Sequence, residues 1–300
     1  MTISRRARIM KKTLGSFVTG PEKSLQERRV AMNRVDRLPR PRKVDYVETT
    51  IGGVPAIVAT PTDTEPDRHI LYLHGGGYTM GSPKSHIAMC ARLAKRSAAK
   101  ITVIDYRLAP ENVYPAAIDD CVSAYQAMAS DIDPALITIA GDSAGGGATL
   151  ATLCALRDAG DPLPACSYLL SPWTDITGSG ETIVSMADVD PMIDVALLHE
   201  ASRMYAGELP LDDPGVSPLF ANLAGLPPML IQTGMDEILL SDSTRLAERA
   251  EEAGVDVQID LREGMWHVYQ FLAGMMPEAT NALIRAAVFI RAKTPALVNA

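Results

Sequence analysis

The chain is poor in the features that mark several large classes of protein. Aromatic residues make up 5% of its 300 residues, and its 4 cysteines form no C-x-x-C pair. The cysteines lie among apolar residues, so we expect buried free thiols, as suits a reducing cytoplasm. No apolar run reaches the roughly 18 residues of a membrane span, and the first residues contain no apolar signal-peptide core. The expected location is therefore cytoplasmic.

Charge and missing motifs exclude further classes. The net charge of −8 argues against a nucleic-acid partner, which would favour a basic surface. The sequence contains no metal-binding motif and no phosphate-binding loop. We therefore expect no cofactor, no metal and no nucleic acid.

A serine between glycines is the most informative feature that is present. Residues 136–140 form an apolar run typical of a buried strand, and residues 150–156 indicate an apolar helix. Between them stands the G-x-S-x-G sequence of residues 141–145, GDSAG. In a strand–turn–helix context this pattern is typical of a nucleophile elbow, whose glycines let strand and helix approach closely. Ser143 is thus the predicted nucleophile.

A second motif predicts where an oxyanion would bind. The apolar run 70–73 ends in the H-G-G-G sequence of residues 74–77. Acyl transfer passes through an oxyanion that needs preorganised N–H donors, and glycines let the backbone come close enough to supply them. In hydrolases with this motif the donors come from this loop and from the residue after the nucleophile, which assigns Gly76, Gly77 and Ala144. We expect His74 to brace the loop rather than to act as a base.

The base and the acid are expected late in the chain, because the order in this fold is Ser, then Asp or Glu, then His. His267 is the one of the 5 histidines that follows an acidic residue placed just beyond a late strand. Asp236 is the predicted acid because it lies nearest the carboxyl end of its strand. Glu237 and Asp242 are the rival acids, and Asp236 could alternatively cap the helix that follows it.

With these residues in place, the chain resembles the bacterial hormone-sensitive-lipase-like esterases, α/β-hydrolases marked by H-G-G-G and G-D-S-A-G-G. The similarity runs from about Val44 to about Arg291 and includes DYRLAPE at residues 105–111. One departure is that Glu-Ile-Leu follows Asp236 where many members have Asp-Pro-Leu, which weakens the motif there. The resemblance implies a carboxylesterase that hydrolyses short- to medium-chain acyl esters, with a small-molecule ester as its partner.

The assigned roles predict a mechanism and leave alternatives open. His267 would remove the proton of Ser143, Asp236 would orient the imidazole, and an acyl-enzyme would form and hydrolyse. A lactone hydrolase or a small-molecule deacetylase would use the same triad. A non-catalytic binding protein is less favoured, because it has no need of all three residues. A homodimer is a possible assembly.

The pattern of segments predicts the architecture. Strand-like and helix-length segments alternate after an opening hairpin at 44–60, which indicates a mostly parallel eight-stranded sheet with helices on both faces, the α/β-hydrolase fold. Residues 175–215 interrupt the alternation and predict a cap insertion in a catalytic domain spanning 44–300. Residues 1–43 hold 13 Lys or Arg against 3 Asp or Glu. We expect them to form an N-terminal cap arm docked on the acidic body, rather than an arm for nucleic acid or membrane.

Overall fold

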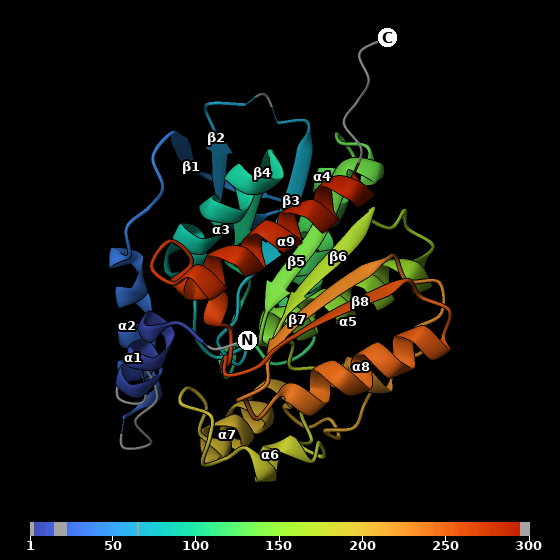
Figure 1. Cartoon of the computed structure of the whole chain (residues 1–300). Helices are drawn as coiled ribbons and strands as arrows, with labels where there is room; N and C mark the ends of the chain where they lie inside the picture. Colours follow the sequence, from blue (N-terminus) through green and yellow to red (C-terminus); the bar gives the residue numbers. More distant parts are fainter. Residues whose placement is uncertain (1–2, 15–22, 65, 295–300) are drawn as a thin grey trace.

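Eight strands form one sheet in the computed structural model, which describes residues 3–14, 23–64 and 66–294 (Figure 1). The spatial order is β1-β2-β4-β3-β5-β6-β7-β8. β1 pairs antiparallel with β2 and β2 antiparallel with β4, and the remaining pairs are parallel. The predicted α/β-hydrolase fold is confirmed. The strands are β1 Val44–Ile51, β2 Val54–Pro61, β3 Arg68–Leu73, β4 Ala99–Ile104, β5 Ile137–Asp142, β6 Cys166–Leu170, β7 Met229–Gly234 and β8 Val257–Arg262.

Helices cover both faces of the sheet. The α-helices are α1 Arg5–Leu14, α2 Leu25–Asn33, α3 Pro83–Ser97, α4 Ala116–Ala129, α5 Ala144–Ala159, α6 Thr182–Ser185, α7 Val195–Ala206, α8 Leu240–Glu252 and α9 Pro277–Lys293. Single 3-10 turns span Arg34–Arg37, Pro134–Leu136, Pro218–Phe220 and Tyr269–Leu272. One core cluster joins the sheet to α4, α5 and α8, and a second joins it to α3 and α9. Figure 1 shows α3 and α9 in front of the sheet.

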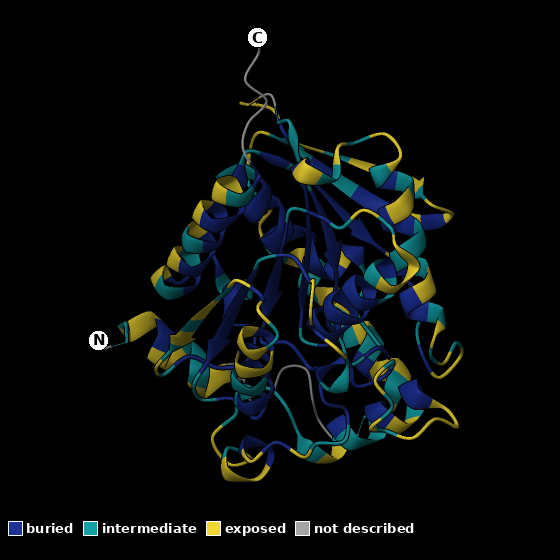
Figure 2. Ribbon diagram, turned by 90° about the vertical axis from the view of Figure 1, so that its right-hand side faces the viewer, coloured by how far each residue is buried: buried dark blue, intermediate teal, exposed yellow. Residues whose placement is uncertain are grey.

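The central strands are buried along their whole length, as Figure 2 shows. Every residue of β5, β6 and β7 is buried. Continuous apolar runs are what a parallel sheet covered on both faces requires. The edge strand β8 instead shows a mixture of exposed and half-buried residues. The four cysteines are buried and free, as expected.

Residues 175–215, which the sequence predicts to be a cap insertion and which are called the cap segment below, contain α6 and α7. Figure 1 shows both helices beyond the lower end of the sheet, with α1 and α2 to their left. Arg28 of α2 is buried and makes a bidentate ion pair with Glu200 of α7, with N–O distances of 2.9 and 3.1 Å. Arg29 pairs with Glu111 at 2.7 Å. The N-terminal helices therefore contact both the cap segment and the loop after β4.

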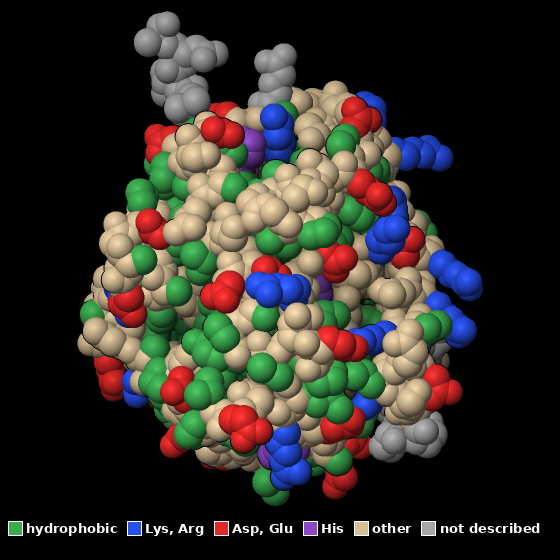
Figure 3. All heavy atoms as spheres, turned by 180° about the vertical axis from the view of Figure 1, so that it is seen from behind, with side chains coloured by type: hydrophobic (Ala, Val, Ile, Leu, Met, Phe, Trp, Pro, Cys, Tyr) green, Lys and Arg blue, Asp and Glu red, His purple; other side chains and the backbone are tan. Residues whose placement is uncertain are grey.

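Positive charge gathers on one side of the molecule. Arg5, Arg6, Arg8 and Lys12 of α1 are exposed. Figure 3 shows most of the Lys and Arg side chains that are visible from behind along the margin on the side where Figure 1 places α1 and α2. No helix in the described part of the chain combines the length and the hydropathy of a membrane span.

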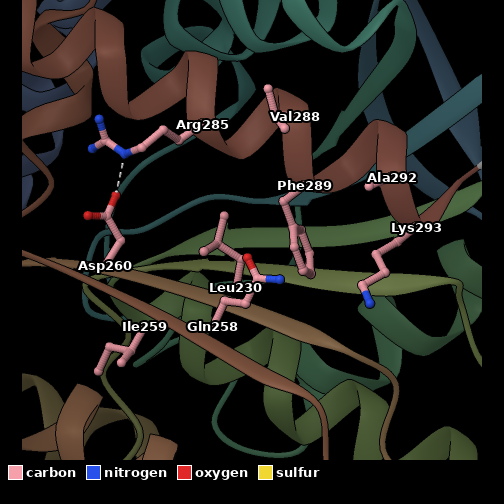
Figure 4. Close-up of a pocket in the computed structure, with 9 residues that line it drawn as sticks. All are labelled: Leu230, Gln258, Ile259, Asp260, Arg285, Val288, Phe289, Ala292 and Lys293. Carbon is pink, nitrogen blue, oxygen red and sulfur yellow. Dashed lines mark hydrogen bonds and ion pairs between the residues drawn. The ribbon is translucent and has the colours of Figure 1, made fainter.

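A hollow of about 450 Å³ lies between β8 and α9 (Figure 4). Its lining includes Phe289 and the ion pair between Arg285 and Asp260, which is 2.8 Å long. None of the predicted site residues lines this hollow. The chemistry predicted from the sequence therefore lies elsewhere, at the carboxyl ends of the central strands.

Candidate active site

Ser143 stands at a sharp turn between β5 and α5. Its backbone dihedrals are φ +54° and ψ −123°, a conformation that costs a non-glycine residue free energy. Two hydrogen bonds hold it there: its N–H donates to the carbonyl of Leu170 at 2.8 Å, and its carbonyl accepts from the N–H of Trp173 at 2.9 Å. The neighbouring strand β6 and the loop that follows it therefore hold Ser143 in this strained conformation.

The glycines around Ser143 are sterically required. A Cβ on Gly141 would lie 2.2 Å from the carbonyl oxygen of Gly145. A Cβ on Gly145 would lie 2.0 Å from the carbonyl oxygen of Leu73. Both distances are far shorter than a van der Waals contact, so any other residue would push strand and helix apart. The geometry is that of the nucleophile elbow expected from the G-x-S-x-G pattern.

The H-G-G-G loop presents backbone N–H groups near this turn. Gly76 has φ +124° and Gly77 has φ +62°, which glycine adopts readily. Within the described residues, the N–H groups of Gly76, Gly77 and Ala144 have no hydrogen-bond acceptor. Ala144 also begins α5, where the helix dipole favours negative charge. These three donors suit an oxyanion, as the sequence predicts.

We expect Gly76→Ala to lower turnover by at least about 10²-fold, the effect of losing one oxyanion donor. The new Cβ would lie 2.2 Å from the carbonyl oxygen of Met80, so the loop has to move. Gly53→Ala is the matched control, because Gly53 also has a positive φ of +81° but has no atom within 4 Å of its added Cβ. Steady-state kinetics on both variants checks the expectation. Equal losses in the two variants would show that backbone strain alone, and not donor placement, is responsible.

A buried carboxylate beside the nucleophile holds the start of this loop. Asp142 Oδ1 accepts from Tyr72 Oη at 2.8 Å and from the Gly75 N–H at 3.1 Å, and lies 3.3 Å from His86 Nε2. Burial raises the pKa of Asp142, but His86 and Tyr72 outweigh it, so that the pKa lies below its usual range. Asp142 is therefore a carboxylate that ties the elbow to the H-G-G-G loop. The sequence offered only one signal for this role, the acidic residue at the second position of GDSAG.

His74 braces the same loop. Its ring stacks on Tyr106 with a centroid distance of 4.2 Å, and its Nδ1 lies 2.9 Å from the carbonyl oxygen of Gly75. Burial, with His86 nearby, lowers the pKa of His74 to about 3. The imidazole is thus neutral at physiological pH and is fully buried, which fits the structural role expected of it.

The acid that contacts His267 is Glu237. Nδ1 of His267 lies 3.2 Å from Oε1 of Glu237. The other oxygen, Oε2, accepts from Ser171 Oγ at 2.8 Å and from the Gly234 N–H at 2.9 Å. Glu237 is fully buried, and the three contacts fix both carboxylate oxygens.

The prediction that Asp236 orients His267 is therefore wrong in this structure. The Asp236 carboxylate pairs with Lys11 of α1, and its side chain is 27% exposed. The two adjacent carboxylates thus have different partners, Lys11 for Asp236 and His267 for Glu237. The other rival, Asp242, accepts from the N–H groups of Thr174 and Asp175 at 2.7 and 2.9 Å. Burial raises the pKa of Asp242 to about 7.

Ser171 links the parts of the site. Its hydroxyl donates to Glu237 and accepts from the N–H of Val268, the residue after His267, at 3.2 Å. Leu170, the residue before Ser171, accepts from the N–H of Ser143. Ser143, Glu237 and His267 are thus connected through one segment at the end of β6. Ser171 and Val268 are 97 residues apart in the chain, so no local sequence pattern predicts their contact.

The electrostatic surroundings favour a charged imidazole at His267. Burial lowers the pKa of His267, but the hydrogen bond and charge of Glu237, together with the charges of Asp190 and Asp142, raise it above its ordinary value. Because Nδ1 faces Glu237, Nε2 is the ring nitrogen left to exchange a proton. A serine, a histidine and a carboxylate arranged in this way can carry out acyl transfer.

Comparisons with known proteins identify the family of this fold. A family model described as alpha/beta hydrolase fold matches residues 70–271. The chain is 38% identical to an acetyl-hydrolase of Streptomyces hygroscopicus over 76% of each chain, and 39% identical to an esterase of Acinetobacter venetianus over 73% of each. A crystal structure of an esterase from the bacterial hormone-sensitive lipase family superposes with a TM-score of 0.94 at 35% identity, covering 98% of this chain and 100% of that one.

The chain belongs to this family of bacterial hormone-sensitive-lipase-like esterases. A second member, the homologue EstE7 from a metagenome library, superposes with a TM-score of 0.91 at 41% identity over 98% of this chain and 100% of that one. The chain is accordingly a serine hydrolase of the carboxylesterase class. The resemblance first seen in the H-G-G-G and GDSAG motifs is confirmed.

Proposed function

We propose that this esterase hydrolyses short- to medium-chain acyl esters through a Ser143–His267–Glu237 triad and an acyl-enzyme. The single observation that carries the proposal is the contact between His267 Nδ1 and Glu237 Oε1. Glu237 and the residue after His267 are both hydrogen-bonded to the segment after β6 that also holds the strained backbone of Ser143. The proposal replaces the acid predicted from the sequence, Asp236, and keeps the other two residues.

In the first half-reaction, Nε2 of His267 takes the proton of Ser143 Oγ as this oxygen bonds to the carbonyl carbon of the ester. The carbonyl oxygen becomes an oxyanion, which the N–H groups of Gly76, Gly77 and Ala144 stabilise. The alcohol leaves with the proton from His267, and an acyl-enzyme remains. A water molecule, deprotonated by the same imidazole, then releases the acid and restores Ser143.

The proposed range of short to medium acyl groups follows from the similarity to the bacterial hormone-sensitive-lipase-like esterases. Helix α7 packs on the oxyanion loop: Tyr205 stacks on Tyr78 with centroids 3.7 Å apart, and the Cβ of Ala201 lies 3.3 Å from where a Cβ of Gly77 would be. A deacetylase of small molecules is the runner-up, because one relative is named an acetyl-hydrolase.

A panel of p-nitrophenyl esters from acetate to palmitate, with lactones and acetylated amines, tests the substrate class. We expect kcat/KM to be highest among the shorter esters and to fall steeply for the long ones. A maximum at palmitate would contradict the proposed acyl range. Selective cleavage of acetylated amines would support the deacetylase instead.

We also propose that residues 1–43 act as part of the cap. Arg28→Ala should weaken discrimination among acyl chains and lower turnover modestly, because it removes the bidentate pair between the buried Arg28 of α2 and the partly exposed Glu200 of α7. Arg40→Ala is the control, since Arg40 pairs with Asp36 on the surface and lies over the ring of Tyr46 in β1, and neither of these residues belongs to the cap segment. The same ester panel provides the measurement. If both variants show the same preference among acyl chains as the unaltered protein, residues 1–43 do not act as part of the cap.

A further inference from the structure

One carboxylate of the cap segment, Asp190, is turned toward the loop that carries Glu237. The residues just before it, 184–189, are mostly exposed, whereas Asp190 itself is half-buried. Its Oδ2 accepts from the N–H of Ile238 at 3.0 Å, and Ile238 follows Glu237 in the chain. Its Oδ1 accepts from the N–H groups of Met192 and Ile193 at 2.7 and 3.2 Å. One side chain thus joins the cap segment to the turn after β7.

Asp190 also belongs to the charged surroundings of His267. Glu237 contacts the imidazole directly, and two further carboxylates contribute negative charge near it: Asp190 from the cap segment and Asp142 from the end of β5. Each raises the pKa of His267, whereas burial lowers it. In the other direction, burial raises the pKa of Asp190 and the charge of His267 lowers it. The coupling between Asp190 and His267 is reciprocal, as linkage requires.

We propose that Asp190 is a positioning residue that stabilises the protonated form of His267 during catalysis, so that seating of the cap segment tunes the base. The inference rests on the proposed function, in which His267 carries the proton of Ser143 through the tetrahedral intermediate. A negative charge beside the imidazole favours that charge-separated state over the ground state, and so lowers the barrier. Because Asp190 reaches its place through the Ile238 N–H, a cap segment that lifts off the loop takes this charge away from His267.

A purely structural role would account for the same hydrogen bonds. Asp190 could simply shape the turn at Met192 and Ile193 and attach it to Ile238. The two roles differ in one observable, the proton affinity of His267. Asparagine separates them, because its amide oxygen still accepts from backbone N–H groups while its negative charge is absent.

The test measures Asp190→Asn in two ways: the pH dependence of kcat/KM on p-nitrophenyl acetate, and the NMR titration of the His267 imidazole. Loss of a nearby negative charge makes the imidazolium less stable, so the proton leaves at lower pH. We therefore expect both the acid limb of the profile and the titration midpoint to move to lower pH. Turnover on the plateau should fall roughly three- to ten-fold, as for a partly solvated charge pair.

Three variants serve as controls. Asp188→Asn removes an exposed charge from the same segment, and Asp194→Asn weakens the start of α7, where Asp194 Oδ1 accepts from the N–H groups of Ala196 and Leu197 at 2.8 and 3.1 Å. Both should leave the titration midpoint of His267 in place. Asp190→Glu keeps the charge and should keep the acid limb near that of the unaltered protein.

The outcomes separate this inference from the proposed function. If D190N titrates as the unaltered protein does while that protein hydrolyses esters, the inference fails and the proposed function stands. If D190E shifts the midpoint as far as D190N does, loss of structure is the cause and the inference fails. If the unaltered protein hydrolyses no ester, the proposed function fails, and the NMR titration still reports whether Asp190 acts on His267. Should D190N not fold, Asp190→Ser takes its place in the same measurements.

Discussion

Ester hydrolysis by Ser143→Ala is expected to fall by about 10³-fold or more, because the residues of a catalytic triad act as a unit and no other group can take the acyl chain. The fold should persist, since the hydrogen bonds that hold residue 143 come from its backbone. Steady-state kinetics on p-nitrophenyl acetate, with circular dichroism to verify folding, provides the measurement. Ser123→Ala is the matched control, because it makes the same change of side chain outside the site. The Ser123 hydroxyl donates to the Gly52 carbonyl in the opening hairpin.

Covalent labelling gives an independent check of the same prediction. A serine-directed organophosphate should add to the peptide that contains Ser143, and mass spectrometry should find no adduct in S143A. A folded S143A protein that keeps more than a tenth of the original turnover would rule out Ser143 as the nucleophile.

Glu237→Gln is expected to lower turnover by about 10⁴-fold, since an amide opposite Nδ1 favours the wrong imidazole tautomer. Glutamine keeps the size of the side chain, so its oxygen can still accept from Ser171 or Gly234. Asp236→Asn should have a small effect by comparison, because the Asp236 carboxylate pairs with Lys11 rather than with His267.

The pair of variants decides between two adjacent carboxylates. Each change removes one negative charge at neighbouring positions, so a difference between them reports the contact with His267 and not the general field. Kinetics with thermal unfolding of both variants provides the measurement. A larger loss of turnover in D236N than in E237Q would restore the acid predicted from the sequence and overturn the triad proposed here.

The parts of the site that the sequence predicts well are those coded by local pattern. The elbow at Ser143 and the loop at Gly76 and Gly77 depend on residue types next to one another in the chain, and sterics allow few alternatives there. The strands follow from long apolar runs, because a sheet buried on both faces tolerates little else. The fold class was for this reason predictable in full.

The choice of acid was not predictable in the same way. Asp236 and Glu237 are neighbours, and which of them faces His267 depends on how the turn after β7 is held by Gly234 and by Ser171, the residue after β6. Such contacts are tertiary, so no spacing in the sequence records them. The same is true of Asp190, which reaches the site from the cap segment.

The strained backbone of Ser143 means that the nucleophile is held at a cost to the stability of the fold. Its φ of +54° with ψ of −123° is a conformation that glycine adopts freely, whereas a serine held there costs about 1–3 kcal/mol. A glycine at this position would remove that cost together with the reactive hydroxyl. The stability of this turn and its reactivity are therefore opposed at a single residue.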